Sequence, residues 1–238
     1  VHGIGEHTGR YEHVGAAFAA AGIDVLAHDQ RGFGLTEGRR AFVTDIDEFL
    51  DDVEALLGER RTLDVPVILM GHSLGGLVAT AHLVSDRPQP DLAVLSSPAL
   101  DAVAPAWQRT AAPVLGRVVP KLHIRADFDG SVLSRDPDVQ RAYEADPLRV
   151  DGSTAALGRA ILRSMATTGE RLERLRVPTY VLHGDEDTLV PPSASEPLAS
   201  LPGVTRRVWP GLRHECLNEP EQDEVIGEIV GWIDGQLD

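Results

Sequence analysis

A serine within a glycine-rich turn is the residue of this chain whose setting points most directly to chemistry. Residues 71–76 read Gly-His-Ser-Leu-Gly-Gly and follow an apolar run at 67–70. The run predicts a buried strand, and the residues after the turn predict a helix. A serine on a tight strand-to-helix turn exposes its hydroxyl, and flanking glycines permit such a turn. Ser73 is therefore the predicted nucleophile.

A serine hydroxyl is a poor nucleophile unless a base takes its proton and an acid orients that base. After a turn of this kind, the acid comes next along the chain and the histidine comes last. His214 lies between the last predicted strand and the last predicted helix, so it is the predicted base. The spacing Gly-x-x-Asp-x-x-Val-Pro selects Asp187 as the acid, with Asp185 as the alternative. His72 and His183 are expected to be structural.

Attack on a carbonyl carbon places negative charge on its oxygen, which two backbone N–H groups can stabilise. Losing one such donor raises the barrier by roughly 3–4 kcal/mol. The residue after the nucleophile, Leu74, should supply one donor. The glycine-rich stretch at 2–5 should supply the other, through the N–H of Ile4.

Composition limits the classes of partner. The 238 residues include 22 Lys and Arg against 37 Asp and Glu, a formal charge of −15 that argues against nucleic acid binding. The single cysteine, Cys216, excludes an internal disulfide, and no Cys/His spacing predicts a metal site. No apolar run approaches the roughly 18 residues of a membrane span. We expect neither a cofactor nor a metal ion.

The elements that must position these residues alternate along the chain, which predicts an α/β fold with a mostly parallel sheet covered on both faces. The expected helices span 10–21, 44–61, 74–85 and 221–237, and the expected strands span 23–27, 65–70, 92–96, 177–183 and 205–209. Between 101 and 173 prolines recur and no strong strand is predicted, although 154–167 has a helical pattern. This segment is predicted to be an insertion over the carboxyl edge of the sheet.

Several segments together resemble the monoglyceride lipase and lysophospholipase branch of the α/β-hydrolase superfamily, among the serine aminopeptidase S33-like hydrolases. The matching segments are 2–11, 29–34, 71–76 and 211–215, with 131–135 and 143–148 inside the insertion. The resemblance implies an α/β-hydrolase core at 1–100 and 174–238, interrupted by a helical cap at 101–173. It also implies a cofactor-free serine esterase acting on monoacylglycerols.

Other functions stay open at this point. A lysophospholipid is the second substrate class, followed by a peptide or another small ester. A different class of function is a non-catalytic α/β-hydrolase fold that binds a ligand or partner. The resemblance implies that the cap holds the acyl chain in an apolar tunnel and makes transient contact with lipid aggregates. The oligomeric state is left open.

The resemblance also implies roles for three further residues. Tyr143 matches a cap tyrosine near the leaving alcohol, and its alternative is a half-buried packing residue. Glu6 and Arg10 match a polar pair near the oxyanion loop. They either contact substrate or, as we favour, pair with each other and fix that loop.

One departure from the family concerns the start of the chain. In α/β-hydrolases the oxyanion loop follows a central strand, yet only Val1 precedes the stretch at 2–5. We therefore expect the N-terminal strands to be missing, and the chain expressed alone to be insoluble or unstable because strand edges are left unpaired. A cytoplasmic location is expected, with a signal peptide left open.

Overall fold

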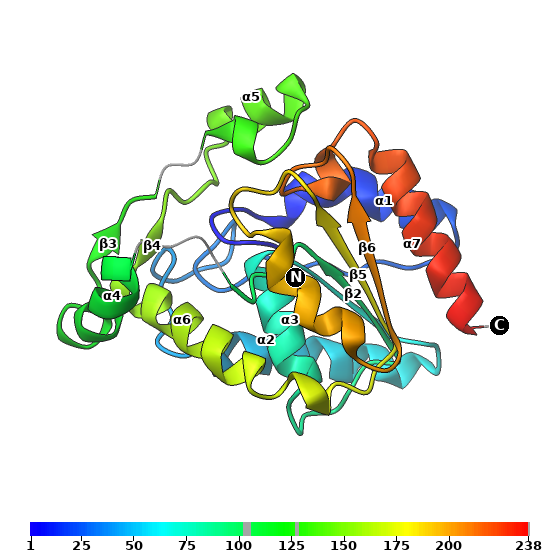
Figure 1. The fold of residues 1–238 in the computed structure, drawn as a ribbon, viewed down its shortest axis with the longest axis horizontal. Helices are drawn as coiled ribbons and strands as arrows, with labels where there is room; N and C mark the ends of the chain where they lie inside the picture. Colours follow the sequence, from blue (N-terminus) through cyan, green and yellow to red (C-terminus); the bar gives the residue numbers. More distant parts are fainter. Residues whose placement is uncertain (102–105, 127–128, 238) are drawn as a thin grey trace.

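Four parallel strands form the central sheet in the part of the chain that the structure describes, residues 1–101, 106–126 and 129–237 of a computed structural model (Figure 1). Their order across the sheet is β1-β2-β5-β6. The strands are β1 (Ile68–His72), β2 (Leu92–Ser96), β5 (Thr179–Gly184) and β6 (Val204–Trp209). The predicted α/β fold with a parallel sheet is confirmed.

Helices cover both faces of this sheet (Figure 1). Alternate residues of β2 point to opposite faces, so Ala93 and Leu95 belong to one apolar cluster, and Leu92 and Val94 to the other. The first cluster is shared with α2 (Asp47–Arg60), α3 (Leu74–Leu83) and α6 (Ala155–Gly169), and the second with α1 (Glu12–Ala20) and α7 (Gln222–Leu237). Across the described residues, no helix has the length and hydrophobicity needed to cross a bilayer.

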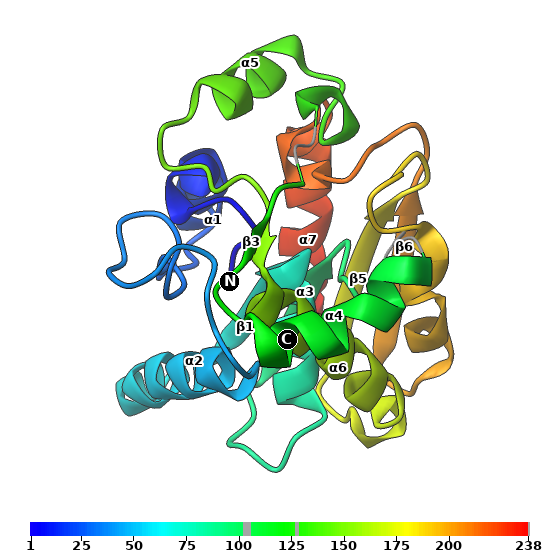
Figure 2. The same ribbon diagram turned by 90° about the vertical axis from the view of Figure 1, so that its left-hand side faces the viewer.

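The segment between β2 and β5 contributes no described strand to the central sheet. It contains α4 (Ala106–Val118), β3 (His123–Ile124), α5 (Pro137–Ala145), β4 (Ser153–Thr154) and α6. β3 and β4 pair antiparallel, a ribbon that the sequence did not predict. Figures 1 and 2 place α5 beyond the carboxyl ends of the strands. The cap limits at 101 and 173 stay a prediction, and residues 102–105 and 127–128 of that segment lie outside the described part.

Short 3-10 turns connect several of these elements. They are η1 (Thr8–Tyr11), η2 (Arg61–Leu63), η3 (Gly130–Val132), η4 (Leu172–Arg174), η5 (Pro192–Ser200) and η6 (Cys216–Asn218). Helix α2 begins later than expected, because Glu48 accepts bonds from Thr44 N (2.8 Å) and Thr44 Oγ1 (2.9 Å) just ahead of its first turn. Thr154 caps α6 by accepting a bond from Leu157 N (3.3 Å).

The strand expected at 23–27 is wrong: these residues form no strand, and Val25 and Leu26 are 43% and 46% exposed. A strand exists only where a neighbour pairs with it, and no described strand lies alongside this segment. On the side of β1 away from β2, Val1 is the one residue among those described that makes ladder-like bonds. Its N–H donates to Met70 O (2.6 Å), and its carbonyl accepts from His72 N (3.0 Å).

Candidate active site

Ser73 occupies the single-residue turn between β1 and α3. Its backbone has φ 53° and ψ −116°, a strained combination for a residue other than glycine. Two backbone bonds hold the turn: Ser73 N donates to Ser96 O (2.9 Å), and Ser73 O accepts from Ala99 N (3.0 Å). The strained backbone persists because the residues at and after the end of β2 hold both the N–H and the carbonyl of Ser73.

The glycines around Ser73 are required by close backbone approach. A Cβ on Gly71 would lie 2.2 Å from Gly75 O, and one on Gly75 would lie 2.1 Å from Val1 O. A Cβ on Gly76 would lie 2.7 Å from Pro98 Cα. Each of these distances is shorter than the separation of nonbonded atoms. The close backbone approaches around the serine turn therefore require glycine at all three positions.

The structure brings His214 and Asp187 together. His214 Nδ1 lies 2.6 Å from Asp187 Oδ2, and both side chains are buried. The other carboxylate oxygen of Asp187 accepts bonds from Leu189 N and Val190 N, both at 2.9 Å. Asp187 is thereby oriented by its own loop, and its Oδ2 faces the imidazole of His214 and, at 3.3 Å, that of His183.

The loops after β5 and β6 are bonded to each other beyond the sheet. Asp185 N donates to Trp209 O, and Glu186 N donates to Leu212 O, each at 3.0 Å. The exposed Asp185 also accepts a bond from Gly211 N (2.6 Å). Asp185, the alternative acid, therefore ties the two loops together, while Asp187 faces His214.

Burial and charge oppose each other in this pair. Burial by itself lowers the pKa of His214, but the charge and hydrogen bond of Asp187 outweigh it and leave the pKa above its ordinary 6.5. Burial raises the pKa of Asp187, but His214 and then the bond from His183 bring it far below its ordinary range. Asp187 is thus ionised at neutral pH and favours the protonated form of the base.

His214 lies beside the serine turn, with its ring 4.8 Å from that of His72. Its carbonyl accepts a bond from Ser97 Oγ (2.8 Å), at the end of β2. Within the described part of the chain, no hydrogen bond joins Ser73 Oγ to His214. Catalytic hydrogen bonds are often long before substrate binds and tighten in the complex.

His72 and His183 are buried structural residues. His72 Nδ1 lies 3.1 Å from Ser96 Oγ, and burial, followed by the charge of His214, lowers its pKa to about 3. His183 bonds through Nδ1 to Ser195 Oγ (2.9 Å) and through Nε2 to Val190 O (2.8 Å). The two rings thus connect the ends of β1 and β5 to neighbouring loops by hydrogen bonds.

The glycine-rich stretch at 2–5 packs directly against the nucleophile. A Cβ on Gly3, the neighbour of Ile4, would lie 3.1 Å from Ser73 Cβ. Leu74 is the first residue of α3, so its N–H has no acceptor within the helix and carries the positive end of the helix dipole. Leu74 follows Ser73 directly and Ile4 follows a residue that packs against it, and the oxyanion role of the two N–H groups stays a prediction. Gln30 N donates to His2 Nε2 (2.9 Å) and holds this stretch in place.

Glu6 and Arg10 do pair, within a buried network. Arg10 donates to Glu6 Oε2 (2.7 Å) and to both carboxylate oxygens of Glu215 (2.6 and 2.8 Å). Glu6 Oε1 accepts bonds from Tyr11 Oη (2.8 Å) and Gly3 N. These contacts favour the role of fixing the oxyanion loop. They also tie that loop to the loop carrying His214.

Glu215 was not singled out from the sequence, and its only signal was its position directly after the predicted base. Burial raises its pKa, but the charge and hydrogen bonds of Arg10 outweigh this effect and leave the pKa below 4.5. Asn218 adds a bond of 2.8 Å to Glu215 Oε2.

Tyr143 on α5 is 7% exposed and packs between two guanidinium groups. The Cζ atoms of Arg10 and Arg149 lie 5.1 and 4.7 Å from its ring centroid. The insertion also bonds directly to the oxyanion loop, because Val150 N donates to Gly5 O (2.9 Å). Tyr143 is thus buried and packed at the junction of the insertion with the oxyanion loop, and contact with a leaving alcohol stays a prediction.

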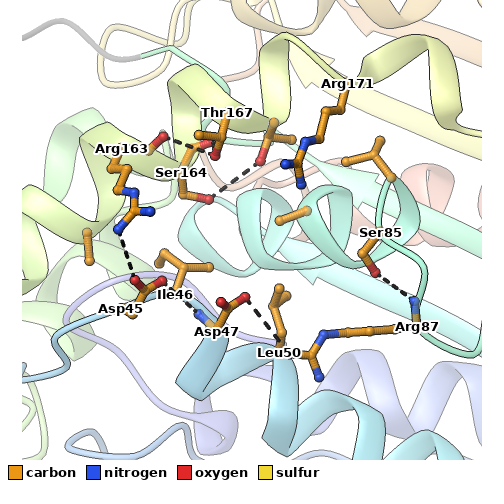
Figure 3. A pocket seen from close by; sticks show the side chains of 14 residues that line it. Asp45, Ile46, Asp47, Leu50, Ser85, Arg87, Arg163, Ser164, Thr167 and Arg171 are labelled. Carbon is orange, nitrogen blue, oxygen red and sulfur yellow. Dashed lines mark hydrogen bonds and ion pairs between the residues drawn. The ribbon is translucent and has the colours of Figure 1, made fainter.

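A cavity of about 210 Å³ lies between α2, α3 and α6, but it is not this site (Figure 3). It lies against the carboxyl end of α3, whereas Ser73 precedes the amino end. Charged side chains around it pair with one another, as Arg163 does with Asp45 (3.2 Å). Among the described residues, no group of three or more histidine, cysteine or acidic side chains is arranged to hold a metal ion.

Comparison with known proteins places the chain in a family. The sequence profile of the family described as "Serine aminopeptidase, S33" matches residues 1–221. A monoacylglycerol lipase of Mycolicibacterium smegmatis is 38% identical over 99% of this chain and 87% of its own length. The phospholipase YtpA of Bacillus subtilis is 31% identical over 98% of this chain and 93% of its own. The solved monoacylglycerol lipase of Paleococcus ferrophilus superposes with a TM-score of 0.92 at 31% identity, covering 99% of this chain and 93% of that one. The chain therefore belongs to the serine aminopeptidase S33 family, in the monoglyceride lipase branch of the α/β-hydrolases.

Proposed function

We propose that this chain hydrolyses the carboxylic ester of monoacylglycerols to a fatty acid and glycerol, through an acyl-enzyme on Ser73. The observation that carries the proposal is the 2.6 Å contact between Asp187 and His214 beside a serine on a strained turn. The similarity to monoacylglycerol lipases over nearly the whole chain supports the substrate class.

In the first half of the reaction, His214 Nε2 takes the proton of Ser73 Oγ as that oxygen attacks the ester carbonyl carbon. The N–H groups of Ile4 and Leu74 stabilise the negative carbonyl oxygen. His214 then protonates the glycerol oxygen, which leaves, and the acyl group stays on Ser73. Asp187 remains ionised throughout and stabilises the imidazolium.

In the second half, water replaces glycerol. His214 takes a proton from water, the resulting hydroxide attacks the acyl carbon, and the same N–H groups hold the oxyanion. The ester bond to Ser73 then breaks, His214 returns the proton to Ser73 Oγ, and the fatty acid leaves.

The cap is proposed to make transient contact with lipid aggregates. The support is an exposed apolar group at the end of α4 and in the turn after it, comprising Val114, Val118, Val119 and Leu122. Val118 is 72% exposed. Tyr143 is proposed to line the path of the leaving alcohol, because it packs where the insertion meets the oxyanion loop.

Labelling with a fluorophosphonate probe tests the nucleophile. The parent protein should be labelled at Ser73, and Ser73→Ala should not be labelled. Ser97→Ala is a matched control, because Ser97 follows directly after β2, close to the serine turn. Its hydroxyl donates to the backbone carbonyl of His214, so it is not a free nucleophile. Equal labelling of the parent and Ser73→Ala would refute the enzyme assignment and favour a binding protein.

A panel of monoacylglycerols, lysophospholipids and aminoacyl esters tests the substrate class. Monoacylglycerols should give the highest kcat/KM. A preference for aminoacyl substrates would instead support a peptidase.

A further inference from the structure

A short stretch of the insertion, residues 131–135, is bonded to the loop after β6 that contains the predicted base. This base loop comprises residues 211–219. Ser134 Oγ donates to Asn218 O at 2.8 Å, and both residues are buried. Ser134 O also accepts a bond from the guanidinium of Arg213 (3.3 Å). Hydrogen bonds thus join two segments whose bonded residues are 84 positions apart in the sequence.

The buried carboxylate of Glu219 accepts bonds from both of these segments. Its side chain is 0% exposed. Oε1 accepts a bond from Arg213 N (2.7 Å), and Oε2 accepts one from Arg135 N (2.9 Å). Ser134 Oγ and Arg135 Nε also donate to Oε2, each at 3.3 Å. Burying a carboxylate costs free energy unless hydrogen bonds and an opposite charge compensate it, and these donors supply both.

The same bonds fix the backbone on both sides of His214. Arg213 precedes the base, and its N–H donates to Glu219. Glu215 follows the base, and its N–H donates to Leu133 O at 2.8 Å. Both peptide N–H groups that flank the base are therefore tied to the insertion, one through the Glu219 carboxylate and one directly.

We propose that Glu219 is a positioning residue for the base. Its carboxylate joins the stretch at 131–135 to the base loop and thereby keeps the imidazole of His214 against Asp187. The proposal rests on the proposed function, because the residue that it positions is the base of that reaction. A carboxylate suits this place because it accepts bonds on two oxygens, one for each backbone N–H. A glutamine has one acceptor oxygen, and its NH₂ group would leave the other backbone N–H without a partner.

The position of the ring affects the pKa of His214. The charged and titratable side chains that face the ring are those of Asp187, Glu215, Glu6 and His72. Burial lowers the pKa of His214, and the charge of Asp187 at 2.6 Å outweighs burial and raises it. A displaced ring would stay buried but lose part of this contact, so its pKa would fall.

Glu219→Gln tests the proposal, with activity expressed per active site counted by complete fluorophosphonate labelling. For a monoacylglycerol, kcat should fall by at least about tenfold, because a displacement of about 1 Å can cost about 100-fold. KM should stay within about twofold, because the change acts on the reacting base rather than on binding of the substrate. The acid limb of the kcat/KM profile should shift to lower pH. Fewer labelled sites with an unchanged kcat per site and an unmoved limb would indicate lost stability alone, and would overturn the proposal.

Two further variants separate position from charge. Glu221→Gln is the matched control, because Glu221 pairs with the same Arg135 but, in the described contacts, its side chain accepts no bond from the base loop. It should leave kcat and the acid limb unchanged. Ser134→Ala changes no charge but removes the bonds of Ser134 Oγ to Asn218 O and Glu219. It should shift the limb in the same direction by a smaller amount, and it keeps the proposal testable if Glu219→Gln does not fold.

NMR titration of the imidazole nitrogens separates this proposal from the proposed function. The pKa of His214 should fall in Glu219→Gln and in Ser134→Ala but not in Glu221→Gln, and this readout needs no turnover. If the parent hydrolyses no ester, the proposed function fails, while the titration still decides whether Glu219 positions the ring. An unchanged pKa of His214 in both variants, or a loss confined to KM, would overturn the proposal. An equal shift in Glu221→Gln would assign the effect to charge alone and would overturn it as well.

Discussion

Removing the Arg10 guanidinium should destabilise the protein strongly, and more at high pH than at low pH. Arg10 bonds to Glu6 (2.7 Å) and Glu215 (2.6 and 2.8 Å), and the exposed fractions of the three side chains are 10%, 4% and 3%. Arg10→Met keeps much of the apolar stem that packs near Tyr143, so the main loss is charge. Two buried carboxylates then lack their cation.

The expected magnitude follows from that burial. Breaking a buried ion pair by removing one partner costs about 3–5 kcal/mol. Total stabilities of domains are about 5–15 kcal/mol, so the loss is a large share of the whole. Activity should fall as well, because Glu6 and Glu215 belong to the loops that carry Ile4 and His214.

The pH dependence has a definite sign. In the parent, the pKa of Glu215 lies below 4.5, so its contribution to stability is present above pH 4.5 and is lost as pH falls through the lower folded value. In Arg10→Met, burial without the cation raises this pKa. The variant's deficit is then full above the raised pKa and shrinks as pH falls toward 4.5, because the carboxylate takes up a proton.

Urea unfolding at about pH 8 and about pH 5, followed by tryptophan fluorescence, measures this difference. The deficit should be smaller at the lower pH, and Arg10→Met with Glu215→Gln should recover part of it. Arg141→Met, which breaks an exposed pair, should cost less than about 1 kcal/mol. If Arg10→Met lowers the free energy of unfolding by less than about 1 kcal/mol, or by the same amount at both pH values, the reasoning is refuted.

Four further outcomes are expected. Asp187→Asn should lower kcat by roughly 10⁴-fold. It should also shift the acid limb of the kcat/KM profile to lower pH, because Asp187 raises the pKa of His214; an unmoved limb would contradict this. Gly75→Ala should abolish fluorophosphonate labelling, since its Cβ would lie 2.1 Å from a backbone oxygen. Gly227→Ala, which meets nothing within 4 Å on α7, should instead raise stability in thermal melts by about 0.5–1 kcal/mol. The buried Cys216, whose pKa burial raises, should react with a thiol reagent only after unfolding; rapid reaction of the native protein would show otherwise.

Local signals carried most of what the sequence could predict about the site. The turn at 71–76, the spacing around Asp187 and the position of His214 each depend on a few neighbouring residues. The structure gathers these three residues at the carboxyl ends of β1, β5 and β6. Their catalytic roles remain proposals that the labelling and pH experiments test.

Non-local pairing explains what the sequence did not predict. Residues 23–27 have strand propensity, but a strand needs a partner. Arg10 and Glu215 are 205 residues apart, so no spacing rule connects them. β3 and β4 have two residues each and leave no periodic pattern. A hollow of about 430 Å³ likewise lies between Arg40 and the distant residues 147–151 of the insertion.

The bonds between the loops after β5 and β6 mean that the acid and the base move as one rigid unit. Asp185 and Glu186 connect to Trp209 and Leu212 on the same side as the bond from Asp187 to the imidazole. The insertion bonds to the same loop, because Glu215 N donates to Leu133 O (2.8 Å). The acid and the base are thus held in place before substrate binds, by each other's loops and by the insertion, and such preorganisation lowers the reorganisation that either half of the turnover needs.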